Sequence, residues 1–194
     1  MPKNRLEAFS DGVIAIIITI MVLELKVPHG AGLAALQPLL PVFLSYVLSF
    51  IYLGIYWNNH HHLLHCAPRI NGAIMWANLH LLFWLSLFPF VTGWVGENHL
   101  AALPSAIYGA VLLLAAIAYY ILQSLILAQI DPDSALAASF RHDLKGKLSP
   151  LLYALGIGVS FFLPWVAACI YVFVALLWLI PDRRIERTAT EYAA

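Results

Sequence analysis

Long apolar blocks dominate this chain of 194 residues. A helix needs about 20 mostly apolar residues to cross the hydrocarbon core of a bilayer, and a spanning segment must satisfy its backbone hydrogen bonds internally. Only 10% of the residues are charged, whereas about a quarter are charged in soluble domains. The sequence therefore predicts an all-α integral membrane protein. The apolar blocks cover residues 5–27, 39–59, 73–96, 103–129 and 148–181.

The last block is long enough for two helices, and Pro164 lies near its middle. Proline lacks the backbone N–H and its ring clashes with the preceding turn, so it either kinks one overlong helix or marks a reversal between two. We expect the reversal, which gives six transmembrane helices. Six spans with short connections make residues 1–194 a single transmembrane domain and leave no room for a separate soluble module.

The positively charged residues fall almost entirely on one side of the membrane in this arrangement. All of the ten Lys and Arg residues except Lys26 lie on the side that holds both termini. Because Lys and Arg accumulate in cytoplasmic connections, both termini are expected to face the cytoplasm. An odd number of spans would separate the basic N-terminus from the basic C-terminal tail. Ten acidic residues balance the ten basic ones, so no nucleic-acid partner is expected.

The first span presents a stripe of side chains with two possible roles. At 100° per residue, an arc of about 100° contains Ile16, Thr19, Ile20 and Leu23. One interpretation is that this stripe meets lipid or a neighbouring helix. The other is that rings of Ile and Leu form a constriction on the axis of an oligomer and gate a water path by dewetting, with a ring of Thr19 hydroxyls. Asp11 points about 140° away from Ile16, toward different surroundings.

Ionisable residues are also more frequent in the first span than in any other. Such groups cost about 2.5–3.5 kcal/mol each at the centre of a membrane helix on insertion scales, so they turn toward protein or water. Asp11 can interact with the helix dipole and interfacial water alone. Alternatively, Arg5, Ser10 and Asp11 form a buried, paired cluster that holds the first span in place.

Four histidines crowd the end of the second span, at positions 60, 61, 62 and 65. His61 and His65 share a helix face, a spacing compatible with metal binding. Carboxylates are missing from spans two to six, however, so neither a metal site nor a cofactor is expected. We expect the histidines at the cytoplasmic interface, with one or two bonded to the polar residues of the first span. Asn78 in the third span is suited to hydrogen bonds between helices.

The first span opens with the pattern R-x-x-x-F-S-D and ends with VLELKVP, and W-x-x-H-H and P-F-x-T follow in the next two spans. Together these features resemble the transmembrane protein 175 family of potassium channels, in its bacterial form. The likeness is close over the first three spans and rests on hydropathy beyond them. The matching residues are Arg5, Phe9, Ser10, Asp11, Trp57, His60, His61, Asn78, Pro89, Phe90, Thr92 and Glu97.

The resemblance implies a six-helix subunit, with both termini cytoplasmic, in a bacterial plasma membrane. Such subunits form homotetramers whose first helices line a pore for K+. Carried onto this chain, the hydrophobic constriction falls at Ile16, Ile20 and Leu23, and the hydroxyl layer falls at Thr19. The polar network behind the pore helix comprises Arg5, Phe9, Ser10, Asp11, Trp57, His60 and Asn78.

The family lacks the TVGYG filter of ordinary potassium channels, and so does this chain. A preference for K+ over Na+ is then expected from the constriction, because K+ sheds its hydration water more readily than Na+. Glu24 and Glu97 near the outer helix ends could concentrate cations. On the residues alone, two other functions stay open: a proton- or solute-coupled transporter that titrates Asp11 and the histidines, and a metal-dependent membrane enzyme using His61 and His65. The resemblance favours a passive channel.

Overall fold

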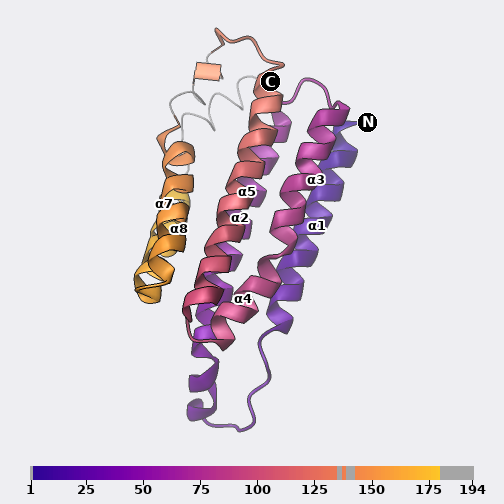
Figure 1. Ribbon diagram of the computed structural model, residues 1–194. Helices are drawn as coiled ribbons and strands as arrows, with labels where there is room; N and C mark the ends of the chain where they lie inside the picture. The colour runs from indigo at the N-terminus through magenta and orange to yellow at the C-terminus, as the bar shows by residue number, and fades with distance from the viewer. Residues whose placement is uncertain (1, 135–136, 139–142, 180–194) are drawn as a thin grey trace.

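The computed structural model describes residues 2–134, 137–138 and 143–179, and within these ranges all regular structure is helical. Figure 1 shows long helices lying side by side, with a hairpin of two shorter helices against them. The elements are α1 (Lys3–Leu23), the 3-10 helix η1 (Leu33–Leu39), α2 (Leu40–His65), α3 (Gly72–Ser86), α4 (Phe88–Glu97), α5 (Ala102–Leu127), α7 (Leu144–Ser160) and α8 (Pro164–Leu179).

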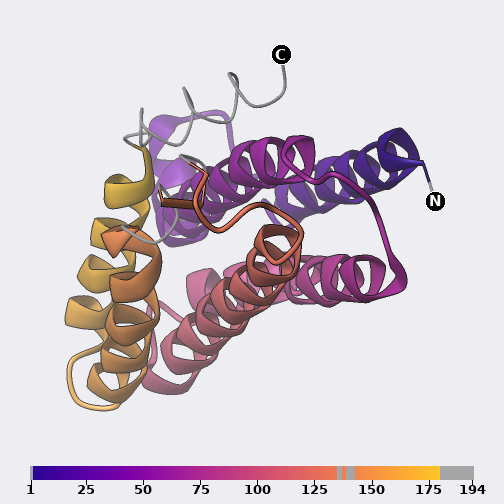
Figure 2. The ribbon, with the colours of Figure 1, turned by 90° about the horizontal axis from the view of Figure 1, so that it is seen from above.

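The predicted six spans are confirmed. Four segments are long and apolar enough to cross a membrane: α1, η1 with α2, α3 with α4, and α5. The other two of the six predicted segments are the helices of the hairpin, α7 with 17 residues and the shorter apolar helix α8 with 16. The turn of the hairpin lies between Ser160 and Pro164, where the sequence predicts a reversal rather than a kink. Seen from above, the hairpin lies beside the bundle of the other helices (Figure 2).

The third apolar block, predicted as one helix, is broken in two. α3 ends at Ser86, Leu87 forms a turn, and α4 begins at Phe88. Pro89 explains the break, because a proline in a helix removes one backbone hydrogen bond and its ring clashes with the carbonyl of the residue four positions earlier. The second helix continues past the apolar block, which ends at residue 59, to His65, so its last turns carry the four histidines as predicted.

The orientation prediction falls partly outside the described residues. Four of its basic residues, Arg141, Arg183, Arg184 and Arg187, lie there. Among the described ones, Lys3 and Arg69 lie at the same end of the bundle, because Lys3 Nζ donates to the carbonyl of His65, 2.6 Å away, at the end of α2. Lys26 follows the opposite end of α1.

Small residues set how closely the hairpin packs on the bundle. The Tyr171 side chain of α8 reaches between Gly109 of α5 and Gly156 of α7. A Cβ atom added at Gly109 would lie 2.0 Å from Tyr171 Oη, and one added at Gly156 would lie 2.4 Å from its Cε1. Tyr171 is buried, and its hydroxyl donates to the carbonyl of Ser105 at 3.3 Å. Gly109 and Gly156 are therefore positions where only glycine allows this close packing.

Candidate functional site

One face of α1 stays exposed although α2, α3 and α4 pack against this helix. Ile16, Ile20 and Leu23 are 58%, 44% and 77% exposed, and Thr19 is exposed beside them. The opposite face packs on the rest of the subunit through Leu6, Ser10, Ile14, Ile17 and Met21. The Ile16, Thr19, Ile20 and Leu23 side chains, called the α1 stripe below, therefore have no covering element within the described part of the subunit.

Thr19 is the polar member of the α1 stripe. Its Oγ1 donates a hydrogen bond to the carbonyl of Ile16 at 2.9 Å. The hydroxyl proton is thereby committed to the helix backbone, while the oxygen retains two lone pairs. An exposed oxygen that can only accept is suited to contact a cation.

A buried chain of hydrogen bonds lies behind the α1 stripe and joins three helices. Ser10 Oγ of α1 donates to the carbonyl of Leu6 at 2.8 Å and accepts from Asn78 Nδ2 of α3 at 2.9 Å. Asn78 Oδ1 lies 2.6 Å from His60 Nε2 of α2. All three side chains are at most 1% exposed. Hydrogen bonds between membrane helices contribute about 0.6–2 kcal/mol each, so this chain fixes how α1 is rotated against α2 and α3.

A second contact lies next to this chain. Trp57 Nε1 of α2 donates to Asp11 Oδ1 of α1 at 3.0 Å, and Trp57 is exposed. The structure thus brings Ser10, Asp11, Trp57, His60 and Asn78 together in two groups at the same α1–α2–α3 contact.

Arg5 and Phe9 lie elsewhere. Both are exposed, Phe9 at 49%. At 100° per residue they point within about 20° of the direction of Ile16, so they continue the line of the α1 stripe toward the N-terminus. In the part of the chain that the structure describes, no hydrogen bond or ion pair joins the Arg5 side chain to Ser10, Asp11 or Trp57. The structure does not bring these two residues into the network behind α1.

The far end of α1 is tied to α4. Lys26 Nζ forms an ion pair with Glu97, and both side chains are exposed. The hydrogen bond to Glu97, together with its negative charge, raises the pKa of Lys26 above its usual value. The Glu24 side chain lies over Gly93 of α4, since a Cβ added there would meet Glu24 Oε2 at 3.0 Å. Because Glu97 pairs with Lys26, the charge of its carboxylate is neutralised within the subunit.

The histidine cluster has the expected helix-face geometry. The rings of His61 and His65 stack with centroids 5.9 Å apart at the end of α2. Within residues 2–134, 137–138 and 143–179, no group of three or more His, Cys, Asp or Glu side chains could hold a metal ion.

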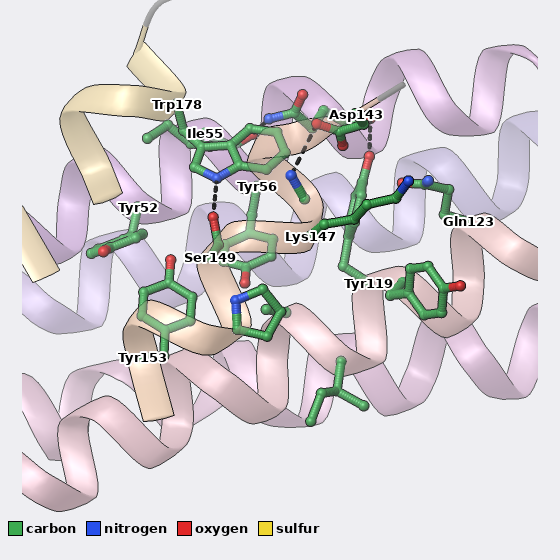
Figure 3. Close-up of a pocket in the computed structure, with 16 residues that line it drawn as sticks. Tyr52, Ile55, Tyr56, Tyr119, Gln123, Asp143, Lys147, Ser149, Tyr153 and Trp178 are labelled. Atoms are coloured by element: carbon green, nitrogen blue, oxygen red, sulfur yellow. Dashed lines mark hydrogen bonds between the residues drawn. The ribbon is translucent and has the colours of Figure 1, made fainter. Parts of the chain in front are cut away.

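A cavity of about 330 Å³ was not anticipated from the sequence. It lies between α2, α5 and the start of α7, with Trp178 of α8 at one side (Figure 3). Its lining combines aromatic rings with a few polar groups, among them Asp143 and Ser149. The sequence signal is that Tyr52 and Tyr56 lie four residues apart in α2, a helical spacing that by itself is typical of a packed core.

The fold and these contacts define an all-helical, multi-pass integral membrane protein whose first helix is anchored from behind by buried polar groups. A family model described as "Endosomal/lysosomal potassium channel TMEM175" matches residues 5–89. A potassium channel of Chryseobacterium sp. is 56% identical over 191 residues, which are 98% of this chain and 100% of that protein. A potassium channel of Chamaesiphon minutus is 30% identical, covering 91% of this chain and 93% of that protein.

A solved structure agrees with these sequence relatives. The crystal structure of a lysosomal potassium-selective channel TMEM175 homolog from Chamaesiphon minutus matches with a TM-score of 0.80 at 27% identity, covering 92% of this chain and 96% of that chain. The chain therefore belongs to the TMEM175 family. The family predicted from the sequence motifs is confirmed, and the likeness extends beyond the first three spans to almost the whole chain. These relatives are ion channels rather than enzymes.

Proposed function

We propose that this chain is the subunit of a passive cation channel that favours K+ over Na+. Residues 1–194 act as one channel domain, with both termini in the cytoplasm. Four copies assemble around an axis, each contributing α1 to the wall of the ion path. The observation that carries the proposal is the α1 stripe, which is apolar except for Thr19, exposed, and left uncovered by the described part of the subunit. The potassium channels among the relatives support K+ as the permeant ion.

The stripe supplies the means of selection. Rings of Ile16, Ile20 and Leu23 make a narrow apolar passage, which an ion enters only after it loses part of its hydration shell. K+ loses water at a smaller cost than Na+, so the passage admits K+ more readily. Thr19 oxygens, which accept but do not donate outward, replace part of the lost water. Selection of this kind is modest, because no cage of carbonyl groups surrounds the ion.

The hydrogen bonds of Ser10, Asn78 and His60 serve as the support of the path. They fix the rotation of α1 about its own axis. A shift of the helix face by one residue would turn the stripe by about 100°, away from the axis of the assembly. The contact of Trp57 with Asp11 adds a second brace at the same place.

The deciding experiment is a reversal potential of the purified protein in a planar bilayer, with K+ on one side and Na+ on the other. We expect current without any other energy source and a reversal displaced toward the K+ equilibrium potential. Flux that requires a pH gradient and disappears in Asp11→Asn would overturn the proposal in favour of a coupled transporter. Mass photometry of the same preparation tests the tetramer independently of the current.

A further inference from the structure

The cavity between α2, α5 and α7 forms a site of its own, away from α1. We infer that it binds an organic ammonium cation that carries apolar or aromatic substituents. The inference does not depend on the ion path, because none of the residues around the cavity belongs to α1. Three observations support it: the walls are aromatic, one carboxylate is buried at the cavity, and the volume suits a small molecule.

Aromatic side chains from four helices make the walls. They are Tyr52 and Tyr56 of α2, Tyr119 and Tyr120 of α5, Tyr153 of α7 and Trp178 of α8. Figure 3 shows Tyr56, Tyr119, Tyr153 and Trp178 arranged around the same space. The electron-rich face of an aromatic ring attracts cations, and several rings together form the cages that recognise quaternary ammonium groups.

The polar ends of three of these side chains are already bonded within the protein. Tyr52 Oη donates to the carbonyl of Tyr171 at 2.6 Å, and Tyr119 Oη donates to that of Asn59 at 3.2 Å. Trp178 Nε1 donates to Ser149 Oγ at 2.9 Å. With these groups satisfied, the side chains offer a ligand mainly their rings. The rings of these three residues therefore suit an apolar or cationic surface.

The buried charge at the cavity is negative. Asp143 is 9% exposed, and its Oδ1 accepts from the backbone N–H of Gly146 at 2.9 Å, which caps the start of α7. A carboxylate can accept several hydrogen bonds, so capping leaves it able to face a cation. Lys147 also borders the cavity, but it is exposed and its side chain extends toward Gln123 (Figure 3).

The volume agrees with a ligand of this class. About 330 Å³ lies at the small end of the range for small-molecule sites. A trimethylammonium head with one benzyl group fits such a space, and a whole phospholipid does not. The bound ligand would bridge α2 and α5 to the hairpin of α7 and α8.

The test compares a cation with its uncharged carbon isostere. The probes are benzyltrimethylammonium and neopentylbenzene, which differ by one nitrogen in place of one carbon. Binding to the full-length protein in phosphatidylglycerol nanodiscs is measured by saturation-transfer NMR, with empty nanodiscs as the background. We expect the cation to bind at least about tenfold more tightly than the isostere. Equal affinities, or no binding of the cation, would overturn the inference.

Two variants locate the bound cation. Asp143→Asn keeps a good helix cap but removes the charge, so the fold is retained and cation binding should weaken at least about tenfold. Ile20→Ala changes the α1 stripe and should leave this binding unchanged. Cation binding that survives Asp143→Asn and is lost in Ile20→Ala would place the cation in the ion path and reject the cavity as its site.

Discussion

His60 Nε2 lies 2.6 Å from Asn78 Oδ1, and this contact fixes the tautomer of the histidine. The Ser10 hydroxyl donates its hydrogen bond to the Leu6 carbonyl, so Ser10 Oγ must accept the hydrogen bond from the Asn78 amide nitrogen. The amide oxygen of Asn78 is then left to accept from His60, which carries its proton on Nε2. The hydrogen bonds are therefore all donated in one direction: from His60 of α2 to Asn78 of α3, from Asn78 to Ser10 of α1, and from Ser10 to the α1 backbone.

This directional chain predicts a large effect of Asn78→Ala. The substitution leaves Ser10 and His60 buried without their partner, so we expect the free energy of unfolding to fall by about 1–3 kcal/mol. Thermal unfolding of the purified protein followed by intrinsic fluorescence measures the loss. Asn58→Ala is the matched control, because Asn58 is exposed on α2. Equal stability of the two variants would show that the hydrogen bonds of Ser10, Asn78 and His60 contribute nothing to the stability of the fold.

The α1 stripe predicts that position 20 controls ion selection. Ile20→Ala widens the passage, so the permeability ratio of K+ to Na+ should fall toward one while the conductance rises. Val22→Ala is a close control, because Val22 and Ile20 are both 44% exposed and point about 160° apart on α1. Reversal potentials of both variants in a planar bilayer provide the measurement. Similar changes in the two variants would mean that the stripe does not face the ion.

The hydroxyl of Thr19 offers a separate test of how K+ is stabilised. Thr19→Val keeps the shape of the side chain and removes the oxygen that accepts outward. We expect a several-fold lower K+ conductance with little change in protein stability, since the lost hydrogen bond is exposed. Single-channel recording gives the conductance. An unchanged conductance would leave the apolar rings as the source of selection.

The ion pair of Lys26 and Glu97 predicts a pH and salt dependence at the far end of α1. The pKa of Lys26 is raised in the folded protein, so the pair is fully present below the usual lysine pKa and is lost as pH rises through the raised value. Salt weakens it at any pH, because both groups are exposed.

Hydrogen exchange of residues 25–32 measures this link. At neutral pH, Lys26→Met should speed exchange there by a few-fold at most, since exposed ion pairs contribute little. The native protein in high salt should approach the rate of the variant. A variant that exchanges no faster than the native protein would show that the pair does not restrain the segment.

Close packing around Tyr171 predicts opposite effects at two glycines of one helix. Gly156→Ala forces the buried Tyr171 ring to move, and overpacking of this kind costs about 1–3 kcal/mol. At Gly158 an added Cβ meets nothing within 4 Å, so Gly158→Ala should leave stability unchanged or raise it by up to about 1 kcal/mol. Thermal unfolding of the two variants compares them directly. A stable Gly156→Ala protein would mean that the hairpin shifts freely against α5.

Hydrophobicity along the chain determined the membrane class and the six spans, because the length of a span follows from the thickness of the bilayer. Pro164 likewise determined the reversal between α7 and α8, since a proline ends a helix by local chemistry. The same chemistry acts at Pro89, but the apolar block around it, residues 73–96, is only long enough for one span, so its length predicts no break there. The motifs of the first three spans, taken together, sufficed to predict the family.

Only the tertiary structure decided which side chains meet. Ser10 and Asn78 are 68 residues apart, and their contact depends on how α1 and α3 are rotated about their own axes. That rotation also turned Arg5 and Phe9 to the exposed face, away from the network in which the motif had placed them. The cavity needs α2, α5, α7 and α8 together. Periodicity within one helix defines its faces, but the packing of all the helices determines what each face contacts.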